Sequence, residues 1–397
     1  MTDSDSTHAI PAPVRLALAF AAFAVVLAPW WMARDEARAS FPGFVVPEVS
    51  TVPDTVPYFA TMEINTESPE RKAHSATLAE LPDGTLVAAW YAGSGEGARD
   101  VTIQFSSRSP DGKWTPPRRI FDREGVSSAM QRFVLSLGNP LLLAGDNGEL
   151  GLLFVTISAG KWSGSSMNLS WSLDGGASWS VPEKLHLNPL ANLSALPRNP
   201  PVALVGGGWG VPVYEEFFGR FPEMLWLRPH NSVPTAAVSR MDDGMSVFQP
   251  SVVPLSKNDA LAFYRDDSGA KSVFLSRSEN RGRTWSARHQ SALPNVDSGV
   301  CALRLPDGRL LCVVNDSSDR SRENLRLALS EDGGVKWRYI ATLVEEAGQT
   351  FAYPYMILGR DGRVRMLYSA RDTRIAYAEF NTAWVDVQSA AAENVIP

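Results

Sequence analysis

The stretch SLDGGASW, residues 172–179, places an acidic residue, two glycines and a tryptophan within eight positions. Nearly the same pattern returns as SENRGRTW at 278–285 and SEDGGVKW at 330–337, and a shortened form, SPDGKW, stands at 109–114. Asp and Asn accept backbone hydrogen bonds in tight turns, and Gly adopts the left-handed backbone that such turns need. The pattern therefore predicts a recurring turn whose Trp packs between neighbouring parts of the fold.

A second unit recurs between these turns: an apolar strand, a turn rich in Gly, Asp and Asn, and another apolar strand. Its turns lie 49 to 64 residues apart and begin at Asp83, Asn147, Gly207, Asn258, Asp307 and Asp361. Two hairpins per repeat make a four-stranded sheet, so six repeats predict an all-β, six-bladed propeller over residues 71–388. The acidic turns would join the two outer strands of a blade.

The sixth repeat lacks the acidic motif but keeps RIAYAEFNTAWVDV at 374–387. We expect a strand near residues 58–64 to complete this blade and close the ring, which protects sheet edges that would otherwise pair with other chains. Residues 40–70 would then be a linker that leads into this strand, and residues 389–397 a C-terminal tail.

Composition supports a folded domain and excludes some functions. Of the 397 residues, 44% are hydrophobic and 20% charged, which indicates a packed core. The net charge of −6 argues against binding nucleic acid. If Asp307-Gly308 is a two-residue hairpin loop, Leu303 faces Cys312 and Cys301 lies diagonally, which predicts two buried free thiols. No spacing of residues indicates a metal or a cofactor.

The N-terminal region predicts export. Residues 16–33, LALAFAAFAVVLAPWWMA, carry no charge over 18 positions, the lower limit for a membrane span, and Trp30-Trp31 stand at the far end. The alternative is a cleaved signal peptide within residues 1–39, because Ala37-Arg38-Ala39 resembles a cleavage site. In both cases we expect the rest of the chain to work outside the cytoplasm, in the periplasm or at the cell surface.

The repeated turns resemble the Asp boxes, or BNR repeats, of the sialidase superfamily, and the resemblance covers roughly residues 70–380. It implies a six-bladed propeller that cleaves a terminal acidic sugar. Three Arg would bind the sugar carboxylate, a Tyr with a Glu beside it would be the nucleophile, and an Asp would be the acid/base. A neutral Tyr suits this substrate because its carboxylate repels an anionic nucleophile. Arg suits the carboxylate because its planar fork donates two parallel hydrogen bonds.

Four segments resemble the stretches that carry these residues. FAYPYMILGRDGRVRMLY implies Tyr353 as nucleophile, RENLRLALSEDGG implies Arg322, and QPSVVPLSKNDALAFYRDD implies Arg265. The loop GSGEGARDVTI offers Asp100 first and Glu96 second as acid/base.

Two positions depart from the family pattern. His74 stands where the first Arg is expected, and Gln249 stands where the resemblance implies the Glu that assists Tyr. Glu215 or Glu216, in VPVYEEFFGRF, offers a carboxylate from a neighbouring blade.

Ordinary structural roles compete with these assignments. A Tyr in a strand is usually part of the core, and a His is often bonded to a backbone carbonyl. Arg265 precedes Asp266-Asp267 and suits a surface ion pair, whereas Arg322 lies in a polar segment. The functional interpretation makes one testable demand: His74, Arg265, Arg322 and Tyr353 must line one pocket, with Asp100 or Glu96 at its rim.

We favour an exported sialidase-type exo-glycosidase whose partner is an acidic glycan. The first alternative is a lyase or hydrolase for uronate polysaccharides, in which His74 or Tyr353 removes the proton next to a carboxylate. The second alternative is a glycan-binding propeller without catalysis.

Overall fold

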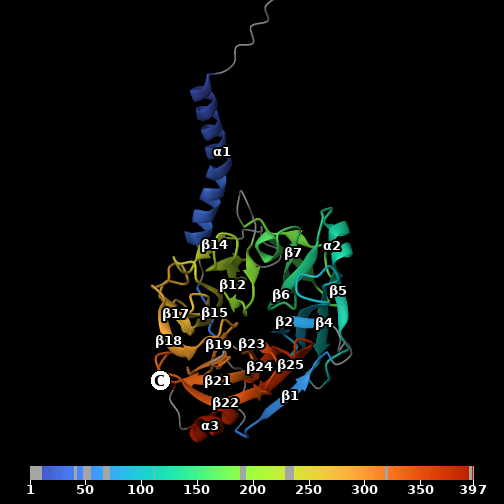
Figure 1. Cartoon of the computed structure of the whole chain (residues 1–397), viewed down its shortest axis with the longest axis vertical. Helices are drawn as coiled ribbons and strands as arrows, with labels where there is room; N and C mark the ends of the chain where they lie inside the picture. Colours follow the sequence, from blue (N-terminus) through green and yellow to red (C-terminus); the bar gives the residue numbers. More distant parts are fainter. Residues whose placement is uncertain are drawn as a thin grey trace, which may run out of the picture.

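The computed structural model describes residues 11–39, 43–47, 55–65, 72–110, 112–187, 194–228, 237–317, 321–392 and 396, with all their side chains except those of 26–39 and 237. Its strands form six sheets around a common centre, and helix α1 (Ala12–Ala39) projects away from this ring (Figure 1). The predicted six-bladed β-propeller is confirmed.

Four blades consist of four strands that follow one another in sequence, with the first strand at the centre. Blade 1 contains β2 (Lys72–Glu80), β3 (Leu86–Gly93), β4 (Thr102–Arg108) and β5 (Arg118–Asp122), and blade 2 contains β6 (Ser136–Ala144), β7 (Leu150–Ile157), β8 (Ser165–Ser172) and β9 (Glu183–Lys184). Blade 4 contains β15 (Val247–Pro254), β16 (Ala260–Asp266), β17 (Ser272–Ser278) and β18 (His289–Pro294), and blade 5 contains β19 (Cys301–Arg304), β20 (Leu310–Val314), β21 (Asn324–Ser330) and β22 (Arg338–Glu345).

Blade 6 joins the two ends of the propeller. It contains β23 (Phe351–Leu358), β24 (Val364–Ala370), β25 (Arg374–Phe380) and, from the N-terminal side, β1 (Phe59–Glu63). The pairing of β1 with β25 aligns Phe59 with Phe380, so the strand expected near residues 58–64 does complete this blade.

Blade 3 departs from the expected four strands. Both β10 (Leu196–Pro197) and β11 (Val202–Ala203) pair with β12 (Trp209–Glu215), which is followed by β13 (Phe221–Leu227) and β14 (Ala237–Arg240). The cause is the sequence PRNPPV at 197–202, because its three prolines have no N–H to donate to a strand ladder. The innermost strand is interrupted, and Arg198 lies in the gap between β10 and β11.

The acidic turns form as expected, between the third and fourth strands of a blade. A bond of 2.8 Å from a Gly N–H to a Ser Oγ recurs in three of them: Gly176 to Ser172, Gly282 to Ser278 and Gly334 to Ser330. A bond of 2.9 Å to the acidic or amide side chain also recurs: Ser178 N–H to Asp174, Thr284 N–H to Asn280 and Lys336 N–H to Asp332. These side chains hold the turns, so they have a structural role.

The turn tryptophans pack against the preceding blade. The ring pairs are Trp337 with Phe263 at 5.9 Å, Trp179 with Phe105 at 6.0 Å and Trp114 with Tyr377 at 5.5 Å between centroids. Gly176 has a φ of +92° and lies directly over Phe105, where a Cβ would come within 2.4 Å of the ring. The repeat therefore requires Gly there for both its conformation and its packing.

The predicted register around the two cysteines is wrong, although both thiols are buried and free as expected. Cys312 faces Ala302 and not Leu303, because the hairpin loop has three residues, 306–308, and is closed by the Leu305 N–H donating to the Arg309 carbonyl. A one-residue change of register moves side chains to the opposite face of a sheet. Accordingly, Cys301 and Cys312 lie in separate hydrophobic clusters.

The C-terminal segment is also different from the prediction. β25 ends at Phe380, and helix α3 (Thr382–Ala391) follows it and crosses the boundary expected at 388. Asn381 caps this helix by accepting a hydrogen bond of 2.9 Å from the Trp384 N–H. Trp384 then stacks on Phe59 at 4.7 Å between ring centroids.

Helix α1 covers the segment for which an anchor or a signal peptide is expected. In the ranges that the structure describes, no helix combines the length and the hydropathy that crossing a bilayer requires. Residues 1–10, 40–42, 48–54 and 66–70 of the expected leader and linker lie outside the described residues, as do the side chains of Ala37-Arg38-Ala39. Both N-terminal alternatives stay predictions.

Candidate active site

The site is built on bulges at one end of the innermost strands. In β2, β6, β15 and β23 the register shifts near the start of the strand. At each bulge a residue other than Gly has a positive φ: Ser75 (53°), Asn139 (42°), Gln249 (49°) and Tyr353 (57°). Such conformations are uncommon and often mark functional sites. All four residues line one cavity.

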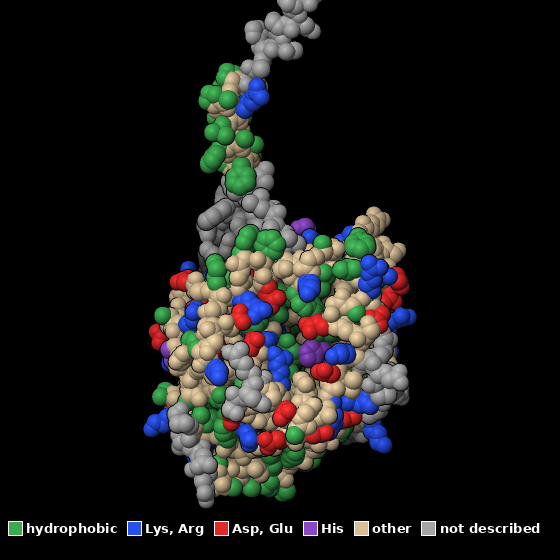
Figure 2. Space-filling view, in the orientation of Figure 1, with side chains coloured by type: hydrophobic (Ala, Val, Ile, Leu, Met, Phe, Trp, Pro, Cys, Tyr) green, Lys and Arg blue, Asp and Glu red, His purple; other side chains and the backbone are tan. Residues whose placement is uncertain are grey.

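This cavity has a volume of about 280 Å³. Its lining combines four arginines with two glutamates and several aromatic rings: His74, Ser75, Tyr91, Glu96, Asn139, Trp162, Arg198, Tyr214, Glu216, Arg220, Phe248, Gln249, Arg265, Arg322 and Tyr353. Charged and histidine side chains gather at the middle of the face that Figure 2 shows. The predicted convergence of His74, Arg265, Arg322 and Tyr353 is present.

Asp297 holds two of the arginines. Its carboxylate accepts a hydrogen bond of 2.9 Å from Arg265 Nε, and its backbone carbonyl accepts one of 2.6 Å from Arg322 Nη2. Asp297 itself has a φ of +57°. Arg265 is only 8% exposed, and its ion pair with Asp297 compensates the buried positive charge. Both guanidinium groups are thus fixed in place before a ligand arrives.

Tyr353 lies in the middle of this arrangement. Its hydroxyl is 3.5 Å from Arg265 Nη1, and the Arg322 guanidinium is 6.0 Å from its ring centroid. The His74 ring meets its ring edge-on at 4.5 Å between centroids. Within the described part of the chain, no carboxylate is hydrogen-bonded to the Tyr353 hydroxyl.

Gln249 stands beside Tyr353 as a neutral amide. Its Oε1 accepts a hydrogen bond of 3.0 Å from Arg265 Nη1, and its Nε2 donates one of 3.2 Å to the Tyr214 hydroxyl. Burial raises the pKa of Tyr214 above its usual range, so this phenol is neutral as well. Gln249 stands where the resemblance implies a Glu. It therefore orients Arg265 and Tyr214 through hydrogen bonds and adds no negative charge to the site.

His74 is neutral. Burial, followed by the nearby charge of Arg198, lowers its pKa to about 3. The site thus has no positive charge where the resemblance implies the first Arg.

The loop after β3 supplies one carboxylate to the cavity. Of the two residues considered, Glu96 lines the cavity and Asp100 does not. Both Asp100 carboxylate oxygens accept hydrogen bonds from the Ser94 N–H, at 3.1 and 3.0 Å, and one also accepts the Ser94 hydroxyl at 2.8 Å. Asp100 shapes the loop, and Glu96 is the residue presented to a ligand.

Blade 3 supplies a second carboxylate, Glu216. Its backbone N–H donates to Ser194 Oγ at 2.8 Å, and its Oε1 is 3.9 Å from Arg220 Nε. Burial raises the pKa of Glu216 above its ordinary value. Glu215, whose pKa burial and Glu223 raise to about 8, is not part of the cavity lining.

Sequence reasoning missed several lining residues, and one signal would have found Asn139, which shares it with the predicted residues Gln249 and Tyr353. Asn139, Gln249 and Tyr353 each precede a Pro and stand eight or nine residues before a hairpin turn. This X-Pro position marks the bulge in three blades. Arg198 has a weaker signal, the proline-rich PRNPPV that interrupts the innermost strand of blade 3.

Comparison with solved structures places this geometry among known folds. The chain matches a Dyadobacter fermentans protein of unknown function (16% identity, TM-score 0.61, 82% of this chain and 100% of that one). It also matches a Hadza microbial sialidase with 16% identity and a TM-score of 0.65, over 78% of this chain and 65% of that one. A third match is the NanB sialidase of Streptococcus pneumoniae, with 10% identity and a TM-score of 0.64, over 84% of this chain and 72% of that one. At these identities the similarity shows the fold alone. A sequence comparison with curated proteins finds no match.

The fold and the site together define a sialidase-like propeller with a cationic central cavity. The model of the BNR repeat-like domain family matches residues 84–366, and the chain belongs to this family.

Proposed function

We propose that the protein is a sialidase-type exo-glycosidase that hydrolyses a terminal sugar bearing a carboxylate. The observation that carries this proposal is the pair of fixed guanidinium groups, Arg265 and Arg322, around Tyr353 in one cavity. Planar guanidinium groups bind carboxylates through paired hydrogen bonds. The sialidases among the similar folds support the same substrate class.

The lining residues suit a two-step displacement. The Tyr353 oxygen attacks the anomeric carbon while the glycosidic C–O bond breaks, and the phenol proton passes to water in the cavity. Glu96 protonates the leaving oxygen, with Asp100 as the second choice for this role. In the second step a water oxygen bonds to the anomeric carbon and gives a proton to the resulting Glu96 carboxylate, the bond from this carbon to the Tyr353 oxygen breaks, and the released phenolate takes back a proton from water. Arg265 and Arg322 hold the sugar carboxylate throughout.

The two alternatives draw on different residues of the site. A uronate lyase that uses His74 as base is less well supported, because a pKa near 3 makes this imidazole a weak base at neutral pH. Acidic-glycan binding without turnover is the second candidate. Its support is Gln249, whose neutral amide lies 3.0 Å from Arg265 where a carboxylate would assist Tyr353.

A screen of the full chain against sialosides and uronate-containing glycans tests the proposal. Binding by calorimetry, reducing ends and the absorbance of unsaturated products are measured on the same samples. New reducing ends from a sialoside support the glycosidase, and unsaturated products support a lyase. Binding without products supports the binding propeller, and absence of binding to every acidic glycan contradicts all three.

We also propose that the protein acts outside the cytoplasm. The support is the uncharged run at residues 16–33 with its flanking Arg15 and Trp30-Trp31. Fractionation of cells and sequencing of the mature N-terminus test this: a soluble protein that begins at Ser40 indicates a cleaved signal peptide, and an intact protein in the membrane fraction indicates an anchor. An intact cytosolic protein would contradict export.

A further inference from the structure

Arg198 is a buried cation without a protein anion. It is 3% exposed, and among the residues that the structure describes no Asp or Glu forms an ion pair with it. Its Nη2 donates a hydrogen bond of 3.1 Å to the Pro354 carbonyl, whereas Nε and Nη1 have no acceptor in the described part of the chain. Burial of a charge is unfavourable unless an opposite charge compensates it.

The place of Arg198 indicates where the compensating charge would come from. Its guanidinium lies 4.6 Å from the Tyr353 ring centroid, and it lines the same cavity as Arg265 and Arg322. Because His74 beside it is neutral, the charge of Arg198 adds to those of the other two arginines. A buried charge that lines a cavity acts strongly on a ligand, since little water screens it.

We infer that Arg198 supplies, from the interrupted strand of blade 3, the third positive charge for the ligand carboxylate that residue 74 lacks. The inference rests on the proposed function, because it takes the ligand to be an acidic sugar. It makes Arg198 a residue that determines specificity: it favours the acid over a neutral sugar of the same shape.

The test compares N-acetylneuraminic acid with its methyl ester, which lacks the charge. Calorimetric titration of the full chain gives both affinities for the wild type and for Arg198→Met. We expect the affinity for the acid to fall at least tenfold and that for the ester to change less than twofold. A purely structural role would weaken both probes alike. Arg326→Met, which removes a positive charge from β21 outside the cavity, is the control and should leave the acid-to-ester ratio unchanged.

Two further variants keep the inference falsifiable if Arg198→Met does not fold. Arg198→Lys retains the charge and should keep the preference for the acid within about threefold. Adding His74→Arg to Arg198→Met returns a guanidinium to residue 74 and should restore part of the preference. An unchanged preference in folded Arg198→Met, or a lost preference in folded Arg198→Lys, overturns the inference and leaves the proposed function intact. A wild-type protein that binds neither probe overturns both.

Discussion

The Gln249 side-chain amide and the Tyr353 hydroxyl both accept a hydrogen bond from the same guanidinium nitrogen of Arg265. Arg265 Nη1 lies 3.0 Å from Gln249 Oε1 and 3.5 Å from the Tyr353 oxygen. A carboxylate at this position would accept the phenol proton during attack, whereas an amide does not at neutral pH. The arrangement aligns Tyr353 and leaves it without a base of its own.

Gln249→Glu should therefore raise kcat. The new carboxylate would lie beside Arg265 and Tyr353 and act as the missing base, for which general-base catalysis suggests a gain of about 100-fold. Initial rates on a sialoside at pH 7 measure it. Gln290→Glu, at an exposed position of β18, is the matched control and should leave kcat unchanged. A folded Gln249→Glu variant that binds substrate without a gain in kcat would contradict this role.

Arg265→Lys should lower kcat/KM by roughly tenfold or more. The guanidinium bonds Asp297 and Gln249 at the same time and still faces the cavity, whereas an ammonium is a single point charge. Steady-state kinetics on the same sialoside measure the loss. Arg277→Lys, on the outer part of blade 4, serves as control. Equal kcat/KM values for Arg265→Lys and the wild type would show that catalysis does not use the paired N–H donors of the guanidinium group.

At the level of elements, the strands were predictable and the bulges were not. Turn dipeptides recur in the sequence, so they fix where each hairpin reverses. A bulge depends on a left-handed backbone at residues such as Asn139 and Tyr353, which ordinary strand periodicity does not reveal. The hairpin that contains Cys312 was also not predictable in detail. One extra residue in its loop shifts the strand register, so Cys312 faces Ala302 and not Leu303. Arg198 reaches the cavity only because prolines interrupt its strand.

The turn motif should contribute to stability and not to ligand binding. Trp337 is 1% exposed and packs on Phe263 of the preceding blade. Trp337→Ala should lower the free energy of unfolding by about 3–5 kcal/mol, the usual loss for a large buried aromatic side chain. Denaturant unfolding measures it. Val335→Ala, at a 74% exposed position of the same turn, should change stability little. A similar loss in both variants would contradict the interblade role.

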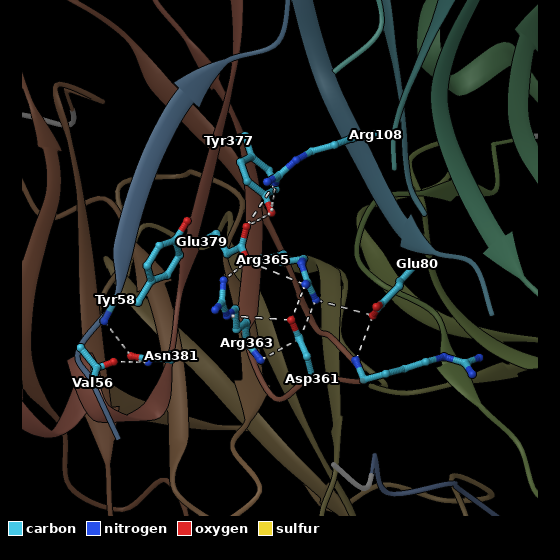
Figure 3. A network of polar contacts seen from close by, with 11 residues as sticks. Val56, Tyr58, Glu80, Arg108, Asp361, Arg363, Arg365, Tyr377, Glu379 and Asn381 are labelled. Carbon is cyan, nitrogen blue, oxygen red and sulfur yellow. Dashed lines mark hydrogen bonds and ion pairs between the residues drawn. The ribbon is translucent and has the colours of Figure 1, made fainter. Parts of the chain in front are cut away.

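For the whole molecule, a polar network joins the first and last blades (Figure 3). Glu379 of β25 is 3% exposed and accepts hydrogen bonds from Arg108 of blade 1 at 3.2 Å, Arg363 at 3.2 Å and the Tyr377 hydroxyl at 2.7 Å. Glu80, at the end of β2 opposite to the cavity, is 3.6 Å from Arg365 of the same network. The ring is thus closed by charge pairs as well as by β1.

Glu379→Gln should destabilise the fold and remove part of its acid sensitivity. Burial alone would raise the pKa of Glu379, but the bond from Tyr377 and the neighbouring arginines outweigh burial and lower it. A lowered folded-state pKa gives stability that is present above the unfolded value near 4.5 and is lost as pH falls through the folded value.

The expected loss at pH 7 is about 3–5 kcal/mol, as for a broken buried ion pair. Unfolding curves from pH 7 to pH 3 measure it, and the difference between wild type and variant should shrink as pH falls below about 4.5. Glu331→Gln, an exposed position, is the control. A difference that is constant with pH would contradict the role of the Glu379 charge.

The most direct measurement compares wild-type protein and Tyr353→Phe on one sialoside, with turnover and binding read in parallel. The phenol oxygen is the proposed nucleophile, whereas Arg265, Arg322 and the ring itself bind the sugar. We predict that Tyr353→Phe loses turnover by at least about 1000-fold, since the covalent step is removed, and binds the acidic sugar within about threefold of the wild type. Turnover that survives in Tyr353→Phe would contradict the proposed mechanism.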